Sequence, residues 1–169
     1  MSVELIKRFS PDSLSVMEFR SKQDYEVTAK IYDNWPLLGE ETETWKVRFS
    51  REFDMTDDHD LFSANRKGLP LYEGKMIWHY DSLFAEPQFW INEDAGKNRL
   101  PTIETRNRDY QLPRLAFRRI ASNTNERTLI STILPASVFS GNSLFNEVGH
   151  TLQDDIRFYL MSVFNSFVL

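Results

Sequence analysis

The stretch at residues 115–135, LAFRRIASNTNERTLISTILP, constrains the fold more than any other part of the chain. Its second half is rich in Thr, Ile and Leu, the side chains that suit a pleated and partly buried surface. Its middle supplies short polar residues that hydrogen-bond their own backbone and tolerate unusual dihedral angles. We therefore predict a β-hairpin with one arm at residues 115–121, a turn at residues 122–127 and a second arm at residues 128–134.

Neither arm of this hairpin alternates cleanly between apolar and polar residues. In the first arm, Leu115 and Phe117 share one face, and Ala116 and Ile120 share the other. Apolar side chains on both faces are typical of an interior strand pair that is covered on two sides. The hairpin is therefore predicted to belong to the core, with its arginines at the edge of that core.

The composition is that of one globular domain or domain fragment over residues 1–169. Hydrophobic residues make up 41% of the chain and aromatic residues 14%, which is enough to bury a core. The chain has no cysteine, which excludes disulfides and fits a reducing compartment. No run approaches the roughly 18 apolar residues that span a bilayer, and residues 1–12 lack the apolar segment of a signal peptide. We expect a cytoplasmic location and no membrane partner.

Two helices are predicted, one near each end of the chain. The first covers residues 22–34, with Ser21 as its N-cap and Asp24 in its first turn. The second has apolar residues at three-and-four spacing from Ile156 to Val168, and Thr151 with Asp154 resembles a capping box. Because this pattern reaches the end of the sequence without a C-cap signal, we expect a long helix in a piece of a larger protein.

Strands are predicted between these helices. Residues 45–54 alternate between apolar and polar side chains, broken only at Arg51, as in a half-buried strand. A further strand is expected at residues 75–80, residues 89–91 are a short apolar segment, and residues 92–114 are weakly patterned and predicted to be loop-rich. The apolar stripe of the helix at residues 22–34 is formed by Tyr25, Ala29, Tyr32 and Trp35. The expected fold class is α+β, with a mostly antiparallel sheet.

Basic residues are concentrated in one part of an acidic chain. The chain has a net charge of −5, yet residues 97–127 hold eight basic and only three acidic residues. Such a block is typical of contact with a polyanion, although a solvated surface that balances acidic neighbours has the same pattern. Its basic members are Lys97, Arg99, Arg106, Arg108, Arg114, Arg118, Arg119 and Arg127.

Motifs for catalysis are sparse. The sequence has no G-x-G turn for a nucleotide cofactor and no G-x-S-x-G nucleophile elbow. His59, His79 and His150 are far apart in the sequence and are expected to be surface or hydrogen-bonded side chains, without a metal. We therefore predict no catalytic residue, no metal ligand and no cofactor in this chain.

A metal-dependent nuclease is an alternative. Asp57 and Asp60 precede Glu73 and Lys75, and carboxylates followed by Glu-x-Lys resemble sites in which Mg²⁺ and a lysine act on a water molecule. Aromatic residues near the basic block are a second feature of interest, because aromatic planes stack on bases, although most aromatics in a domain are core. They are Trp78, Tyr80, Phe84, Phe89, Trp90 and Tyr110.

Three motifs together resemble bacterial restriction–modification adenine-specific DNA methylases. They are WKVRFSREFDMTDDHDLF at residues 45–62, PLYEGKMIWHYD at residues 70–81, and the hairpin sequence at residues 115–135. VFSGNSLF at residues 138–145 and the closing NSFVL also fit. The resemblance runs from about residue 10 to the end, and it is to the part downstream of the catalytic domain in type II and type IIG-like proteins.

The resemblance implies a target-recognition region. Such a region positions duplex DNA so that an adenine can be flipped into a separate active site that uses S-adenosylmethionine. The family's catalytic signature, Asn or Asp followed by Pro-Pro and an aromatic residue, has no match here, and the methyl-donor motif is also absent. We therefore expect this chain to be catalytically silent alone, with the rest of the methylase as its partner and S-adenosylmethionine bound by the parent protein.

The expected DNA contacts come from the basic block. Those in loop sequence are expected to reach phosphates or bases, namely Lys97, Arg99, Arg106, Arg108 and Arg114. Arg118, Arg119 and Arg127 flank the hairpin and are expected to be partly structural. A different hypothesis is an interaction module that packs on the methylase or on a partner subunit without touching DNA.

Overall fold

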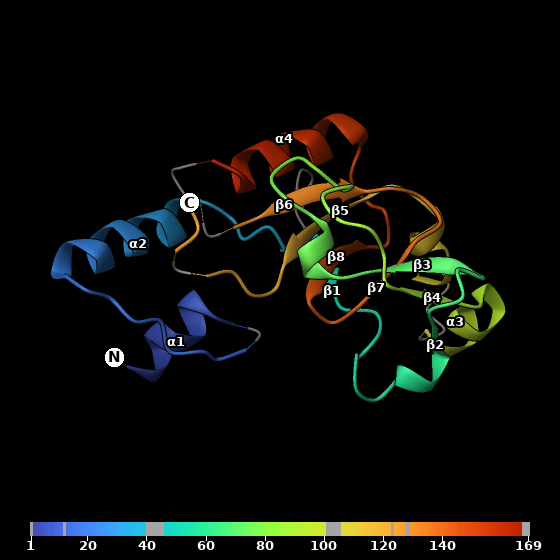
Figure 1. Cartoon of the computed structure of the whole chain (residues 1–169). Coiled ribbons are helices and arrows are strands. Elements are labelled where there is room, and N and C mark those ends of the chain that lie inside the picture. The colour runs from blue at the N-terminus through green and yellow to red at the C-terminus, as the bar shows by residue number, and fades with distance from the viewer. Residues whose placement is uncertain are drawn as a thin grey trace. The chain divides into compact units, whose positions relative to one another are not determined.

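The computed structural model describes residues 2–11, 13–39, 46–100, 106–122, 124–127 and 129–166, with the backbone alone at residues 106–108. The chain divides into two compact units, Met1–Lys46 and Val47–Leu169 (Figure 1). Within the described ranges, every helix is too short or too polar to span a lipid bilayer.

The first unit contains two helices, α1 at Val3–Phe9 and α2 at Lys22–Asn34. The Ser21 hydroxyl accepts a hydrogen bond from the Asp24 backbone N–H at 3.1 Å, and the Asp24 carboxylate accepts one from the Ser21 N–H at 3.0 Å. This reciprocal cap satisfies two N–H groups that the first turn leaves unpaired. The predicted helix and its N-cap are confirmed.

An aromatic cluster forms the interior of the first unit. The ring of Phe9 lies 5.8 Å from Phe19, 6.2 Å from Tyr25 and 5.0 Å from Tyr32, measured between centroids, and each pair meets edge to face. Trp35, which was predicted on the same stripe as the two tyrosines, is 72% exposed. It is the C-cap of α2 and has an extended backbone, so the helical stripe has already ended there.

The second unit contains two four-stranded sheets. The first sheet has the order β1-β8-β5-β6, and all of its pairs are antiparallel. Its strands are β1 at Arg48–Ser50, β8 at Leu144–Val148, β5 at Arg114–Arg118 and β6 at Ser131–Leu134. Leu115 lies opposite Ile133, and Phe117 lies opposite Ser131, which confirms the predicted hairpin with shorter arms.

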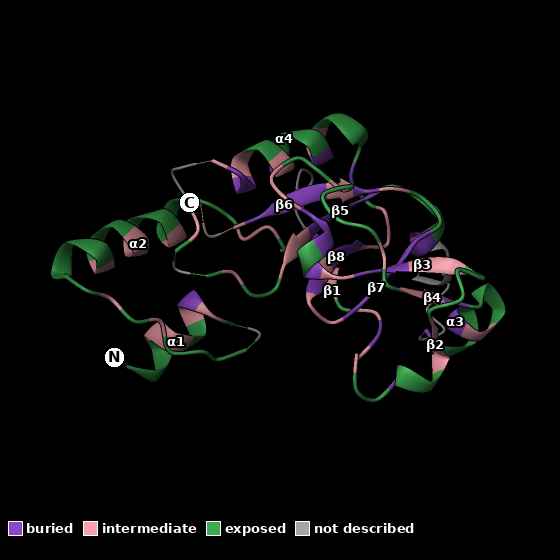
Figure 2. Cartoon of the chain, viewed as in Figure 1, coloured by how far each residue is buried: buried purple, intermediate pink, exposed green. Residues whose placement is uncertain are grey.

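Both faces of β5 are covered. Helix α4, at Asp154–Phe164, packs against β5 and β6, and the ring of Phe164 lies 5.9 Å from that of Phe117. On the other face, Ala116 belongs to a buried apolar cluster with Met76 and Ile77. Figure 2 shows this hairpin largely buried beneath α4. The prediction of an interior strand is confirmed for β5, whereas β6 ends the order of the described sheet.

Helix α4 differs from its prediction at both ends. Its N-cap is Gln153, which makes no side-chain cap, so the capping box predicted at Thr151 and Asp154 is wrong. The helix has 11 residues and ends at Phe164, where the Asn165 backbone N–H donates to the Met161 carbonyl at 3.1 Å. The expected long helix without a C-cap is therefore wrong, and Phe167 and Val168 lie outside the described residues.

The side of α4 that faces the sheet holds a charge. The Arg157 side chain is 2% exposed and that of Glu147 is 0% exposed. Arg157 Nε donates to Glu147 Oε2 at 2.7 Å, and its Nη2 donates to Oε1 at 3.0 Å. This bidentate ion pair compensates the charge of the buried arginine. Tyr159, which belongs to the predicted apolar pattern of the same helix, is exposed.

The second sheet has the order β2-β4-β3-β7, with only the β3–β7 pair parallel. Its strands are β2 at Phe62–Ser63, β4 at Phe89–Ile91, β3 at Leu69–Tyr72 and β7 at Phe139–Ser140. The short apolar segment at residues 89–91 forms β4. In the part of the chain that the structure describes, four α-helices and two mostly antiparallel sheets make an α+β fold, as predicted.

The strand predicted at residues 75–80 is wrong. These residues form a short 3-10 helix, Gly74–Met76, followed by a tight turn, and the strand lies upstream at β3. Pro70 is inside β3 and lies opposite Trp90 of β4. The neighbour on the other side, β7, pairs only with Leu71 and Tyr72, so a residue without an N–H is tolerated at Pro70.

The predicted strand at residues 45–54 is shorter and divided. Only Arg48–Ser50 pair with β8, and Phe53 forms a separate bridge with Gly141, beside β7. The break in alternation at Arg51 therefore marks the point where the chain leaves one sheet for the other. Trp45 lies outside the described residues.

Candidate nucleic-acid interface

A helix that was not predicted from the sequence carries the first two residues of the basic block. Helix α3 spans Glu93–Arg99, within a region predicted to be loop-rich. The Asn92 side chain caps it by accepting from the Ala95 N–H at 3.1 Å. Acidic residues stand in its first turn and Lys97 and Arg99 in its last, which complements the helix dipole. This order of cap and charges was visible in the sequence.

One glycine sets the orientation of α3. A Cβ added to Gly96 would lie 2.6 Å from the ring of Phe139, so this position must be glycine for the helix to rest on the core. Lys97, the next residue, is exposed. Arg99 is half-exposed, and its Nε donates to Asp58 Oδ1 at 2.5 Å. The two cations therefore differ: Lys97 is accessible to a ligand, whereas Arg99 already contacts a buried carboxylate.

The turn between β2 and β3 adds two further cations, which lie outside the basic block of the sequence. Arg66 has a φ of 58°, and its guanidinium lies 5.4 Å from the centroid of the Trp90 ring. Lys67 follows it and is exposed. Among the residues that the structure describes, Arg66, Lys67 and Lys97 have no carboxylate within ion-pair distance.

This turn lies against the start of α3. Gly68 has a φ of 100°, and a Cβ there would lie 2.1 Å from the Ile91 carbonyl oxygen and 2.9 Å from the Asn92 nitrogen. The backbone of the turn is thus pressed onto the junction between β4 and α3. We refer to the cations carried by these two neighbouring elements as the β4–α3 basic surface, which consists of Arg66, Lys67, Lys97 and Arg99.

Arg114 does not lie where a DNA contact requires. Its side chain is 1% exposed, and its Nη2 donates to both carboxylate oxygens of Glu52, at 3.0 and 3.1 Å. The same nitrogen donates to the Val138 carbonyl at 3.1 Å. Glu52 in turn accepts from the Ser140 N–H at 2.8 Å. Arg114 therefore joins the first sheet to the core, which corrects its placement in a loop.

The side chains of Arg118 and Arg127 also bind groups of the protein itself. Arg118 Nη2 donates to the Ile77 carbonyl at 2.6 Å, and burial lowers the pKa of its guanidinium. Arg127 Nη1 donates to the Asn165 carbonyl at 2.6 Å. Arg119 is exposed. These contacts agree with the expectation that the arginines flanking the hairpin are partly structural. The side chains of Arg106 and Arg108 lie outside the described residues.

The nuclease alternative has no metal cluster in the described part of the chain. No three His, Cys, Asp or Glu side chains among those residues come together as a metal site. Asp57 and Asp60 are exposed, and Glu73 pairs with Lys75 at 3.1 Å. Asp58, which lies between Asp57 and Asp60 in the sequence, is buried. Its carboxylate accepts hydrogen bonds from the Asp54 N–H at 2.8 Å and from Arg99 Nε.

The three histidines are hydrogen-bonded, as expected. A ring nitrogen of His59 lies 2.9 Å from the Thr56 carbonyl oxygen, and one of His150 lies 3.1 Å from that of Pro113. His79 Nδ1 lies 2.7 Å from Asn165 Oδ1. Since the Asn165 oxygen also accepts from the Ser131 N–H at 3.1 Å, His79 Nδ1 is the donor in this contact.

Comparison with protein-family models, with curated proteins and with solved structures gives no match to this chain.

Proposed function

We propose that this chain is the DNA-binding target-recognition fragment of a larger adenine-N6 DNA methyltransferase in a restriction–modification system. The β4–α3 basic surface carries this proposal, because Arg66, Lys67 and Lys97 are cations without an ion-pair partner in the described part of the chain. Exposed cations of this kind suit phosphate contacts, which position a protein on DNA without reading its sequence. The resemblance of the three sequence motifs supplies the reaction class.

In this proposal the chain holds the duplex and the parent protein performs the chemistry. A separate domain of the parent would bind S-adenosylmethionine and methylate the adenine after it leaves the helix. Lys97, Lys67 and Arg119 would contact phosphates, with Arg106 and Arg108 as further contacts from the basic block. The proposed location is the cytoplasm, because a chain without cysteine fits a reducing compartment.

A salt titration of the whole chain with duplex DNA tests the proposal. We expect a dissociation constant on the order of micromolar or weaker, rising steeply with salt as counterions are released. Lys67→Glu and Lys97→Glu should each weaken binding by about tenfold at low salt.

Lys7→Glu is the matched control for these variants. It makes the same change in charge at an exposed position of α1, and it should leave DNA affinity unchanged. Binding without salt dependence, or an equal loss of affinity in all three variants, would exclude the β4–α3 basic surface as the contact. Absence of binding to any duplex at low salt would refute the proposed function itself.

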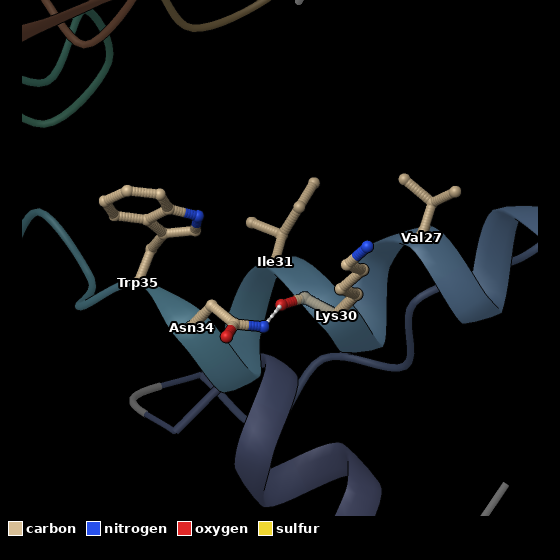
Figure 3. Close-up of a pocket in the computed structure, with 5 residues that line it drawn as sticks. All are labelled: Val27, Lys30, Ile31, Asn34 and Trp35. Carbon is tan, nitrogen blue, oxygen red and sulfur yellow. Dashed lines mark hydrogen bonds between the residues drawn. The ribbon is translucent and has the colours of Figure 1, made fainter.

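A second candidate is an interaction module that binds the methylase or another subunit without DNA. It is favoured by a shallow hollow of about 490 Å³ on α2, lined by Val27, Lys30, Ile31, Asn34 and Trp35. Figure 3 shows Val27, Ile31 and Trp35 projecting from the same side of the helix. Charge reversal of Arg106 and Arg108 separates the candidates: lost DNA binding supports the first, and assembly without DNA affinity supports the second.

A further inference from the structure

The turn at residues 78–84 presents three large apolar side chains to solvent. Tyr80 is 51% exposed, Leu83 77% and Phe84 54%. Single exposed apolar residues are common, but several in one short turn are typical of a binding site. None of these residues belongs to the β4–α3 basic surface.

This turn is anchored to the core at several points. Trp78 and Asp81 exchange two backbone hydrogen bonds, of 2.8 and 3.1 Å. The Tyr80 N–H donates to the Ser131 carbonyl of β6 at 3.1 Å, and His79 donates to Asn165 at the end of α4. The exposed side chains are therefore held on a rigid support, which reduces the entropy that a ligand must remove on binding.

The backbone at the tip of the turn is strained. Tyr80 has a φ of 63°, in the left-handed region that favours glycine and is unfavourable for a bulky side chain. The hydrogen bond from its N–H to Ser131 holds it there. Strain of this kind, maintained by surrounding contacts, is found where a side chain must be presented to a ligand.

The aromatic rings of the turn form a stack that ends in solvent. The rings of Trp78 and Phe84 are stacked with centroids 5.3 Å apart and planes at 23°. The Arg118 guanidinium lies 4.8 Å from the centroid of Trp78 and has no carboxylate within ion-pair distance in the described part of the chain. The exposed end of this stack, Phe84, is suited to one more planar group.

The charge around the turn favours a base over a phosphate. Arg118 contributes one positive charge, whereas Asp81 in the turn and Glu86 two residues after it contribute one negative charge each. The Asp81 carboxylate accepts from the Leu83 N–H at 2.7 Å. A site without net positive charge has little attraction for a phosphate, whereas the face of any nucleobase can stack on an aromatic ring. Base flipping, which belongs to the proposed function, also leaves an unpaired base in the duplex.

We infer that the turn at residues 78–84 is a stacking site for an unpaired nucleobase, with Phe84 as the ring that contacts it. This inference rests on the proposed function, since it assigns a second contact to the same bound DNA. The β4–α3 basic surface would supply the sequence-independent affinity, and the aromatic turn would add affinity for DNA that contains a displaced base.

The test compares two DNA probes with the whole chain. One is a fully paired duplex, and the other is the same duplex with a single unpaired 2-aminopurine. The wild type should bind the second probe more tightly, by about fivefold to 150-fold, the range that base–aromatic stacking supplies. The 2-aminopurine fluorescence should fall on binding because the base stacks. Phe84→Ala should remove both effects.

Phe158→Ala is the matched control, because Phe158 on α4 is an aromatic residue of nearly equal exposure, 53%. It should keep the preference for the unpaired base. Phe84→Leu retains an apolar side chain of similar size without a ring and protects the test against misfolding of the alanine variant. Phe84→Leu should also lose the preference for the unpaired base. If this variant keeps the preference, apolar contact without an aromatic ring is sufficient, as it would be for a protein partner, and the inference is overturned.

The outcomes separate the two proposals. Salt-dependent duplex binding without a preference for the unpaired base overturns the stacking site and leaves the proposed function intact. Lys67→Glu and Lys97→Glu should weaken binding to both probes equally and leave their ratio unchanged. If the wild type binds neither probe at low salt, the proposed function and the stacking site both fail.

Discussion

Two sets of cationic side chains in the second unit have opposite environments. Arg114 and Arg157 are buried and each pairs with a glutamate that is itself buried or nearly so. Lys67 and Lys97 are exposed, with no carboxylate in reach among the described residues. Arg114 and Lys97 belong to the same basic block of the sequence, so position in the block does not decide which cation is free to meet a ligand. Their partners do.

Removal of a buried cation is expected to have the largest effect on stability. Arg157→Leu should lower the free energy of unfolding by about 3–5 kcal/mol, because Glu147 would remain as an uncompensated charge in the interior. Urea unfolding followed by tryptophan fluorescence measures the change. In the double variant Arg157→Leu/Glu147→Leu, part of this loss should be recovered, since no unpaired charge is left. The recovery is incomplete because the Leu115 and Leu152 N–H groups lose Glu147 as their acceptor. An equal loss in the double variant would show that the uncompensated charge of Glu147 is not the source of the loss.

Arg114→Leu should come next in size, with a loss of about 2–4 kcal/mol. The effect is expected to be smaller because the Glu52 side chain is 8% exposed and reaches some solvent, whereas that of Glu147 is 0% exposed. DNA affinity of the folded variant, measured well below its unfolding midpoint, should match that of the wild type. A selective loss of DNA affinity would place Arg114 at the interface after all.

The pH dependence of stability offers a third test of buried charge. Burial raises the pKa of the Asp109 carboxyl above its ordinary value of 3.8, with Glu147 adding to the rise and the Gly149 N–H, Arg114 and His150 opposing it. The contribution of Asp109 is therefore fully present below pH 3.8 and is lost as the pH rises through the raised pKa. Relative to the wild type, Asp109→Asn should gain stability over that window and no further above it.

Unfolding curves of both proteins at a series of pH values measure this difference. The asparagine can keep the hydrogen bond from the Gly149 N–H, which is 2.9 Å in the wild type, so shape is conserved. The effect should be smaller than that of breaking either ion pair. If the free energies of unfolding of the two proteins differ by the same amount at every pH, the pKa of Asp109 does not change on folding.

Substitution of an exposed cation is expected to cause the smallest change in stability. Lys97→Gln should alter the free energy of unfolding by less than about 0.5 kcal/mol, because its side chain is exposed and has no ion pair among the described residues. Its effect should appear in binding, where the slope of log affinity against log salt should fall by about 0.9 if one phosphate contact is lost. An unchanged slope would remove Lys97 from the interface.

Sequence patterns predicted some elements well and others poorly, for identifiable reasons. The helix at residues 22–34 was predicted because its cap, Ser21 with Asp24, is local chemistry. The strand at Leu69–Tyr72 was missed because Pro70 usually ends a strand, and only the two-residue length of β7 makes room for it. Helix α3 was missed because Gly96 lies at its centre, where the approach of Phe139 requires it.

The candidate site was only partly predictable. Lys97 and Arg99 were identified from charge, but Arg66 and Lys67 were not, because they lie outside the basic block in the sequence. The contact between Gly68 and the start of α3 brings the two elements together. The aromatic residues of the turn at residues 78–84 were noted as possible stacking groups, yet their exposure depends on the hydrogen bonds that Ser131 and Asn165 make with the turn.

The sequence by itself determined the hairpin, the α+β class and the capped helix α2, because each follows from interactions between residues close together in the chain. Only the tertiary structure decided which cations are buried. Glu52 lies 62 residues before Arg114, and the two sheets bring them within hydrogen-bond distance. A guanidinium can be buried only where a carboxylate and carbonyl groups replace its water, and no local pattern specifies where a partner so distant in the sequence will lie.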